Sequence, residues 1–348
     1  MQKTLIIAPN WIGDAVMTEP LIRHLNRAST LTVLAAPWVA PVYRAMPAIN
    51  EVIEADFSHG KIEFSKRRQV AKLLAKHSFD QAFVLPNSWK SILIPVLAKI
   101  PKIYGYQGEI RSALLSQYLP NPPKKHRPPM VDHYLNLMHL VNPLDVCDPS
   151  FKRPQLQIDT EAQHQSLTLL APPGQAQNFY IFAPGAEYGP AKQWPSQHFA
   201  TLATEILLKN PACHVLLLGS AKDRAICEQI LQGTDSSLHA QIHNLCGLAT
   251  LDQSIALISL AQGMASNDSG LMHIAAALSI PQVAFYGSSD PKHTPPLSPY
   301  AKILFLGLDC SPCHQRKCPL GHLNCLKQIT PQSAFEALNR SVTLRNSH

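Results

Sequence analysis

Residues 263–286 read GMASNDSGLMHIAAALSIPQVAFY, and this stretch carries the pattern that decides the fold. Short apolar strands are expected at 263–266 and 282–286, with an alanine-rich helix at 271–278 between them. A strand, a helix and a further strand of these lengths form a parallel βαβ unit. Ligands of parallel sheets bind where strands end, so the polar turn between strand and helix is a candidate binding loop.

The same alternation of strands and helices extends along the chain in both directions. It pauses at PNPPKKHRPP (120–129) and at APPGQAQN (171–178), which have the composition of a loop and of an interdomain linker. We therefore expect an α/β protein of two doubly wound parallel-sheet domains facing across a cleft, at 1–172 and 173–330, followed by a C-terminal helix and tail at 331–348. The other expected strands are 4–8, 31–35, 81–85, 102–106, 179–183 and 214–218, and the other expected helices are 15–27, 64–77, 89–99, 197–208, 223–231, 251–260 and 331–343.

Composition narrows the functional classes. The chain has 348 residues, a formal net charge of +7 and sixteen histidines, so its surface should attract anions. No basic run interleaved with aromatic residues suggests nucleic-acid binding. Neither GxGxxG after the first strand nor GxxxxGK[ST] occurs, which argues against dehydrogenases and P-loop kinases.

The longest apolar stretch, SILIPVLAKI (91–100), is far shorter than the roughly 20 residues of a membrane span. With no signal-peptide pattern at the N-terminus, we expect a cytoplasmic protein.

One strand-to-helix loop of the first half carries a carboxylate. PNWIGD (9–14) places Asp14 at the start of a helix, where the dipole and free N–H groups favour an ionised side chain. Asp14 is then either a capping residue or a base that faces a substrate. Gly13 beside it leaves room for close approach.

Three loops of the second half suit a phosphorylated ligand. APGAEYGPAKQWP (183–195) offers Lys192, and LLLGSAKD (216–223) offers Asp223 to a ribose or base. The turn NDSG presents backbone N–H groups at the start of the helix that carries His273, either as a pyrophosphate site or as a simple N-cap box. The residues of that turn are Asp268, Ser269 and Gly270.

PNWIGDAVM, GAEYGPAKQWP, GSAKD, NDSGLMHIAAAL and FYGSSDPKHTPPLSP resemble the lipopolysaccharide heptosyltransferases, enzymes of the GT-B fold that use ADP-heptose. The resemblance covers nearly the whole chain and is greatest to the transferase that adds the second inner-core heptose. It implies that Asp14 is the catalytic base, that Lys192 meets the donor phosphates, and that the donor sugar and phosphates bind at the NDSG turn and the helix of His273. Asp223 falls where the family has an acidic residue near the nucleoside. No cofactor or metal is required for such a reaction.

The implied reaction is an inverting transfer of heptose from ADP-L-glycero-D-manno-heptose to heptosyl-Kdo2-lipid A. Alternatives are the first heptosyltransferase or another GT-B sugar transferase, a nucleotide-sugar epimerase, and a non-catalytic nucleotide-sugar binding protein. The acceptor is a phosphorylated glycolipid, so we expect a peripheral location at the inner face of the inner membrane. Arg67, Arg68 and Arg111 are its candidate ligands, with Lys124, Lys125 and Arg127 as further cations. The alternative for the charged helix is a solvated face.

A cysteine-rich segment, CSPCHQRKCPLGHLNC, ends the second domain. Cys310, Cys313, Cys318 and Cys325 follow the spacing C-x2-C-x4-C-x6-C. Such a set suggests a structural zinc site, although the second pair lacks the usual C-x2-C spacing. Reduced loop cysteines are the interpretation favoured by sequence alone.

Overall fold

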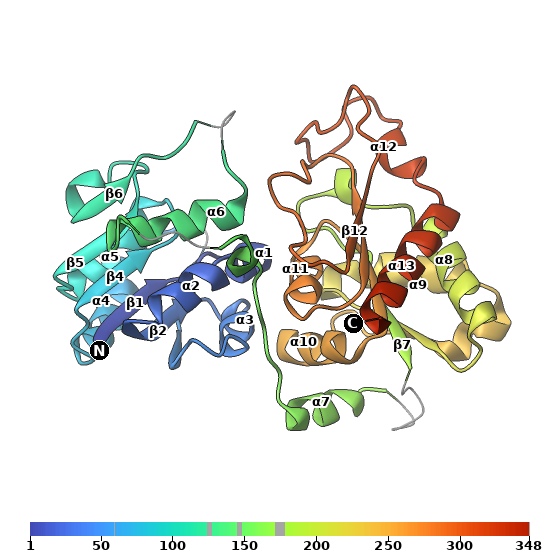
Figure 1. The fold of residues 1–348 in the computed structure, drawn as a ribbon, viewed down its shortest axis with the longest axis horizontal. Coiled ribbons are helices and arrows are strands. Elements are labelled where there is room, and N and C mark those ends of the chain that lie inside the picture. Colours follow the sequence, from blue (N-terminus) through green and yellow to red (C-terminus); the bar gives the residue numbers. More distant parts are fainter. Residues whose placement is uncertain (59, 124–126, 145–147, 171–177, 348) are drawn as a thin grey trace. The chain divides into compact units, whose positions relative to one another are not determined.

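The computed structural model describes residues 1–58, 60–123, 127–144, 148–170 and 178–347. The chain divides into two compact units, Met1–Gln157 and Ile158–His348. Each unit is built on a sheet with helices packed against it (Figure 1).

The sheet of the first unit is parallel throughout, in the order β3-β2-β1-β4-β5-β6. Strand order therefore reverses between β1 and β4, the topological switch point at which α/β sheets bind ligands. The strands are β1 (Gln2–Ile7), β2 (Ser29–Ala35), β3 (Glu51–Glu54), β4 (Gln81–Val84), β5 (Lys102–Tyr106) and β6 (Gln117–Leu119).

Helices cover this sheet in two groups. Leu74 and Ile92 of α4 and α5 pack with Leu5 and Val84 of the sheet in one buried cluster. Helices α1, α2, α3 and α6 form the other group and pack on one another. The helices are α1 (Ile12–Met17), α2 (Glu19–Leu25), α3 (Ala40–Arg44), α4 (Phe64–Ala75), α5 (Trp89–Leu97) and α6 (Met130–Leu135), with 3-10 turns at η1 (Ser112–Leu114), η3 (Asn136–Leu140) and η4 (Pro149–Lys152).

The helix expected at 15–27 is interrupted. The structure has two short helices, α1 and α2, which meet at Thr18. Pro20 stands in the first turn of α2, the position that a proline tolerates because no backbone N–H is needed there. The Thr18 hydroxyl donates to the Ala15 carbonyl at 2.6 Å. Expecting one continuous helix was wrong because Pro20 begins a second one.

The second unit repeats the same topology. Its parallel sheet has the order β12-β11-β10-β7-β8-β9, so its switch point lies between β7 and β10. The strands are β7 (Phe179–Ala183), β8 (His214–Leu217), β9 (Ile242–Asn244), β10 (Gly263–Asn267), β11 (Gln282–Tyr286) and β12 (Ala301–Phe305). Its helices are α7 (Thr160–Leu167), α8 (Ser196–Lys209), α9 (Arg224–Gln232), α10 (Leu251–Leu260), α11 (Gly270–Ala277), α12 (Asn324–Lys327) and α13 (Pro331–Asn346), with 3-10 turns at η5 (Pro190–Lys192), η6 (Ala221–Asp223) and η7 (Ser236–Gln241).

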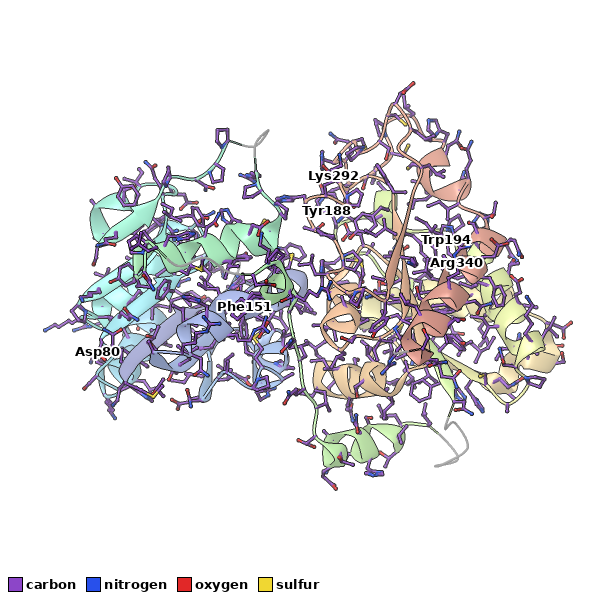
Figure 2. The ribbon with its side chains drawn as sticks, viewed as in Figure 1. Asp80, Phe151, Tyr188, Trp194, Lys292 and Arg340 are labelled. Carbon is purple, nitrogen blue, oxygen red and sulfur yellow. The ribbon has the colours of Figure 1, made fainter. Side chains whose placement is uncertain are left out.

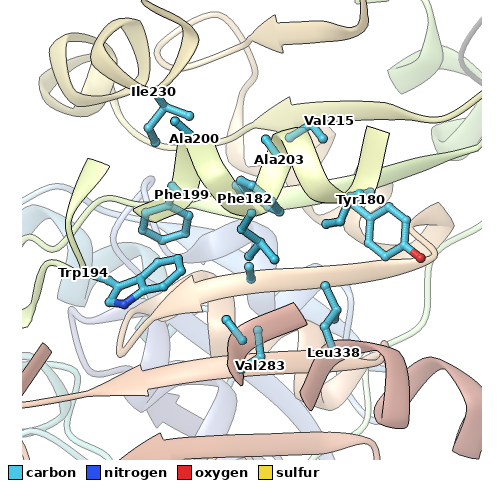
Figure 3. Packing of buried hydrophobic residues seen from close by; sticks show 14 of the residues in the cluster. Tyr180, Phe182, Trp194, Phe199, Ala200, Ala203, Val215, Ile230, Val283 and Leu338 are labelled. Atoms are coloured by element: carbon cyan, nitrogen blue, oxygen red, sulfur yellow. The ribbon is translucent and has the colours of Figure 1, made fainter. Parts of the chain in front are cut away.

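Aromatic stacking anchors the core of this unit (Figure 3). The fully buried Trp194, labelled also in Figure 2, stacks on Phe285 at 4.0 Å between ring centroids and meets Phe199 edge-on. Its indole N–H donates to the Ile329 carbonyl at 2.9 Å. The end of the loop that follows β7 is therefore fixed in the core, two residues after Lys192.

The unit boundary lies earlier than the expected one after residue 172. Helix α7 belongs to the second unit because it packs against α10, with Gln163 donating to the Ser259 hydroxyl at 2.9 Å. The terminal helix α13 also packs on this unit, against α8 and β11, and is not a separate tail. Most of the expected linker, 171–177, lies outside the described residues. Among the described residues, no helix has the length and apolar character needed to cross a membrane.

Candidate active site

Asp14 lies at the switch point of the first sheet, in the first turn of α1 directly after β1. Trp11 is the N-cap residue and its side chain makes no capping bond. The Asp14 carboxylate does not occupy the capping position; it accepts a hydrogen bond from the Tyr134 hydroxyl at 3.0 Å. This contact disfavours the capping alternative and leaves a carboxylate held by a phenol.

The acidity of Asp14 differs from the sequence expectation. Burial raises the pKa of Asp14, and the hydrogen bond from Tyr134 lowers it in part. Helix α1 has only six residues, and burial outweighs the effect of its dipole on the Asp14 carboxyl. The expectation that the helix start favours the ionised form of Asp14 therefore needs correction. Burial also raises the pKa of Tyr134 and of Tyr43, and the Asp14 charge adds to both shifts. Both phenols therefore stay protonated and can donate to a carboxylate.

Sequence reasoning missed Tyr134 because it lies 120 positions from its partner. Helix α6, which carries it, is held by the preceding residue: the His133 ring stacks on Tyr106 at 3.8 Å, and the Tyr106 hydroxyl donates to the His133 carbonyl at 2.6 Å. No short motif signals such a contact, because it arises from the packing of α6 against α1.

In the second unit, Lys192 and Asp268 come together at the switch point between β7 and β10. The ammonium of Lys192 is 2.5 Å from Asp268 Oδ2, and the two side chains are 18% and 5% exposed. Asn267 joins the loops that carry them: its amide donates to the Pro184 carbonyl at 2.6 Å, and its oxygen accepts from the Trp194 backbone N–H at 2.9 Å. Asn267 was not singled out from the sequence, although it stands within the NDSG turn.

Two buried side chains, His273 and Tyr286, lie close enough to this ion pair for the Asp268 charge to shift their pKa values. Burial lowers the pKa of His273 to about 4. The nearby Asp268 charge raises this pKa by a smaller amount, and the Lys192 charge lowers it further. The imidazole is therefore neutral at physiological pH. Burial, and secondarily the Asp268 charge, raises the pKa of Tyr286, whose hydroxyl donates to the Thr294 carbonyl at 2.6 Å. Lys192 and Asp268 thus form an ion pair beside a neutral imidazole. The Arg316 guanidinium lies over the same Tyr188 ring as the Lys192 ammonium, at 5.5 and 5.1 Å from its centroid.

Ser269 and Gly270 begin α11 as expected. Ser269 is the N-cap residue, makes no side-chain cap, and has its hydroxyl 3.2 Å from that of Ser266. Asp223 lies between β8 and α9, in the strand-to-helix loop where it was expected. Its carboxylate closes a capping box with the Ser220 N–H and hydroxyl at 2.8 and 2.7 Å, and it packs on Gly185, where a Cβ would lie 2.5 Å from it. Asp223 therefore packs against both Gly185 and Gly219, in the loops after β7 and β8. Its carboxylate accepts hydrogen bonds from Ser220 of its own turn.

The three arginines proposed for the acceptor separate into two kinds. Arg67 is buried and donates to the carbonyls of Ile62 and Lys90 at 2.7 and 3.1 Å. Arg111 is fully buried and donates to the carbonyls of Tyr106 and Pro86. Expecting these two guanidinium groups to face a ligand needs correction, because backbone carbonyls occupy their N–H groups.

Arg68 is exposed, as is Arg127, whereas Lys124 and Lys125 lie outside the described residues.

Exposed apolar side chains follow five of the six strands of the first sheet. Since all strands of this sheet run the same way, their carboxyl ends share one edge, which is also the edge of Asp14. Ile110 after β5 is 98% exposed and Trp11 after β1 is 54% exposed. We call this set the apolar rim; it comprises Trp11, Trp38, Ile62, Phe64, Trp89 and Ile110.

The four cysteines of the C-terminal segment line one small cavity together with His322. Among the described residues, no three Cys, His, Asp or Glu side chains are already grouped so as to hold a metal ion. The Lys192–Asp268 pair at the β7–β10 switch point differs from the cysteine cluster, because it joins one cation to one anion.

Comparison with known proteins identifies the family of this chain. The model of glycosyltransferase family 9 (heptosyltransferase) matches residues 67–324. Lipopolysaccharide heptosyltransferase 2 of Escherichia coli (strain K12) is 36% identical over 344 residues, which cover 97% of each chain. Lipooligosaccharide heptosyltransferase 2 of Haemophilus influenzae is 37% identical, over 96% of this chain and 98% of its own.

A solved structure extends the similarity to three dimensions. The E. coli ADP-heptose lps heptosyltransferase II superposes with a TM-score of 0.85 at 34% identity, over 99% of this chain and 100% of that one. This match confirms the expected GT-B architecture of two Rossmann-like sheets. The chain therefore belongs to glycosyltransferase family 9, the heptosyltransferase family, and is a glycosyltransferase.

Proposed function

We propose that this enzyme transfers heptose from ADP-L-glycero-D-manno-heptose to heptosyl-Kdo2-lipid A, with inversion at the anomeric carbon. The relatives at 36–37% identity over nearly their full length are named heptosyltransferase 2, which supports the second inner-core transfer. The similar structure is that of an ADP-heptose enzyme, which supports the donor.

The second unit is the donor side in this proposal. A nucleoside diphosphate needs cations and N–H donors, and both occur at the β7–β10 switch point: the Lys192 ammonium and the start of α11 at Gly270. An ammonium has three N–H groups, of which Asp268 takes one. The negative charge that grows on the departing diphosphate is balanced there, so the reaction uses protein groups where other transferases use a metal.

The first unit supplies the base. The Asp14 carboxylate takes the proton of the acceptor hydroxyl while that oxygen bonds to the anomeric carbon and the bond to the diphosphate breaks. A raised pKa makes Asp14 a stronger proton acceptor, and Tyr134 holds the carboxylate in one orientation. Asp14 at the switch point of its sheet is the single observation that carries the proposed mechanism.

The acceptor is an amphipathic glycolipid, and the apolar rim lies on the edge of the sheet that also carries Asp14. Exposed cations of the same unit, among them Lys66 and Arg68 near the start of α4, suit phosphate groups of the acceptor and of anionic lipids. These features support a peripheral position at the inner face of the inner membrane in the cytoplasm.

Mass spectrometry with defined acceptors tests the proposed reaction. ADP-heptose is incubated with the protein and either heptosyl-Kdo2-lipid A or Kdo2-lipid A. We expect addition of one heptose to the first acceptor only. Preferred transfer to Kdo2-lipid A would identify the first heptosyltransferase instead, and an altered nucleotide sugar without acceptor would indicate an epimerase.

A further inference from the structure

The segment between β12 and α12, residues 306–323, has no helix or strand. Irregular segments of this length are uncommon inside compact domains unless something holds them. Leu308 and Leu323 at its two ends pack against the core, whereas Leu306 and Leu320 are exposed and three of its cysteines are only half-buried. Ordinary core packing therefore does not explain why cysteine recurs here.

The four cysteines converge although they span sixteen positions of sequence. Cys310, Cys313, Cys318 and Cys325 all line the small cavity that His322 also borders. All four are free thiols in the structure.

Backbone donors surround one of these sulfurs. The backbone N–H groups of Leu323, Leu320, Gly321 and His322 donate hydrogen bonds to the Cys318 sulfur. A chain that curls around a sulfur in this way stabilises a thiolate, the form in which cysteine binds metals. Arg316 and Lys317 stand between the second and third cysteines and supply positive charge to the same segment.

We propose that Cys310, Cys313, Cys318 and Cys325 bind one Zn²⁺ ion in a closed, tetrahedral, structural site. Four thiols lose their protons to solvent and form four Zn–S bonds, and no redox partner is involved. The four sulfurs share one cavity, and rotation about the Cα–Cβ bond of each cysteine moves its sulfur within that cavity. His322 borders the ligands as a neighbour that can donate to a thiolate.

The site would fix a segment that braces the donor loop after β7. The Arg316 carbonyl accepts from the Ala191 N–H at 3.1 Å, and a Cβ on Gly189 would lie 2.6 Å from that carbonyl. The Tyr188 hydroxyl donates to the His314 carbonyl at 2.7 Å. Lys192 is the next residue of this loop after Ala191, so metal binding would order the backbone beside the ammonium. The consequence for donor binding rests on the proposed donor role of Lys192.

Metal analysis of the full-length protein, purified without chelator, tests the site independently of activity. We expect about one equivalent of zinc per chain in the wild type and close to none in Cys310→Ser/Cys313→Ser. Cys213→Ser is the matched control, because Cys213 is a buried free cysteine outside the cavity and its loss should leave the zinc content unchanged.

A second measurement keeps the test valid if the double variant fails to fold. Apo wild type, prepared by thiol-directed zinc release, is titrated with Co²⁺, and we expect the intense visible bands of a tetrahedral thiolate complex together with a higher melting temperature. Absence of zinc in the purified protein combined with no cobalt band would overturn the proposal. Intact mass showing disulfides among the four cysteines would overturn it as well. Neither outcome bears on heptose transfer itself.

Discussion

Two effects act in opposite directions on the carboxylate of Asp14. Burial raises its pKa and the hydrogen bond from Tyr134 lowers it, with burial the larger of the two. The ionised carboxylate is thus less stable in the folded protein than in the unfolded chain. At pH values above both pKa values this lowers the free energy of unfolding, and the loss disappears when the group is protonated or replaced by a neutral one.

Asp14→Asn should therefore separate catalysis from stability. As the base, its loss should reduce kcat by about 10²–10⁴. The neutral amide removes the cost of the buried charge, so the melting temperature at neutral pH should stay level or rise. ADP affinity should stay close to wild type, because Asp14 is not in the unit proposed to bind the donor. Steady-state kinetics, thermal unfolding and calorimetric binding of ADP check these three expectations. A near wild-type kcat would remove Asp14 from the mechanism, and a marked loss of stability would favour a structural role.

Tyr134→Phe should move the acid limb of the pH–rate profile. Activity requires ionised Asp14, so kcat/KM falls as pH drops through the pKa of this group. Removing the Tyr134 hydroxyl deletes the hydrogen bond that lowers this pKa, and the acid limb should shift to higher pH. A pH profile of kcat/KM measures the shift. An unchanged limb would mean that another group controls it.

At the scale of elements, burial explains which strands the sequence predicted. The central strands β1, β2, β4 and β5 of the first sheet and β7, β8, β10 and β11 of the second were all expected within a few residues. The four missed strands, β3, β6, β9 and β12, are the edge strands of the two sheets. Edge strands have one neighbour and are only partly buried, as in the pattern of Ala301–Phe305, so their sequences lack a continuous apolar run.

The ion pair between the β7 and β10 loops permits a matched comparison of two lysines. Lys192→Ala removes a charged hydrogen-bond donor worth roughly 1.5–3 kcal/mol, so ADP affinity should fall about ten-fold or more. It also leaves the nearly buried Asp268 without its cation, which should lower the melting temperature.

Lys222→Ala is the control, because Lys222 pairs with Glu187 at 2.8 Å on the exposed surface of the same unit. ADP affinity and stability should both remain close to wild type there. Calorimetric titration with ADP is the measurement. Equal affinity losses in the two variants would point to a general effect of net charge and would contradict a direct contact from Lys192.

For the whole molecule, sequence motifs predicted the charged side chains at the switch point of each sheet but not the residues that contact them. Asp14, Lys192 and Asp268 follow strands within short recognisable loops, and parallel topology carries each to a switch point. Tyr134 reaches Asp14 only through the packing of α6 on α1, which no local spacing encodes. For the same reason, the burial of Arg111 could not be distinguished from exposure by reading GYQGEIRSALL alone.

The apolar rim leads to a prediction about membranes. Large exposed apolar side chains gathered on one edge of a unit, with cations nearby, are typical of an interaction surface. The protein should therefore bind vesicles that contain anionic phospholipid more strongly than neutral ones, and high salt should weaken the binding by screening the charges. Co-sedimentation with vesicles at low and high salt measures both effects.

A pair of acidic substitutions tests whether the rim is the surface involved. Ile110→Glu places a charge where the side chain is 98% exposed, so the fold should tolerate it while membrane contact is lost. Losing the burial of one such side chain, at about 1.5–3 kcal/mol, should weaken vesicle binding roughly ten-fold or more. Leu208→Glu makes the same kind of change at an exposed leucine of α8 in the second unit and should bind like the wild type. If Leu208→Glu weakens binding as much as Ile110→Glu, the contact is not made by the apolar rim. If neither variant changes it, the attraction is carried by the cations alone.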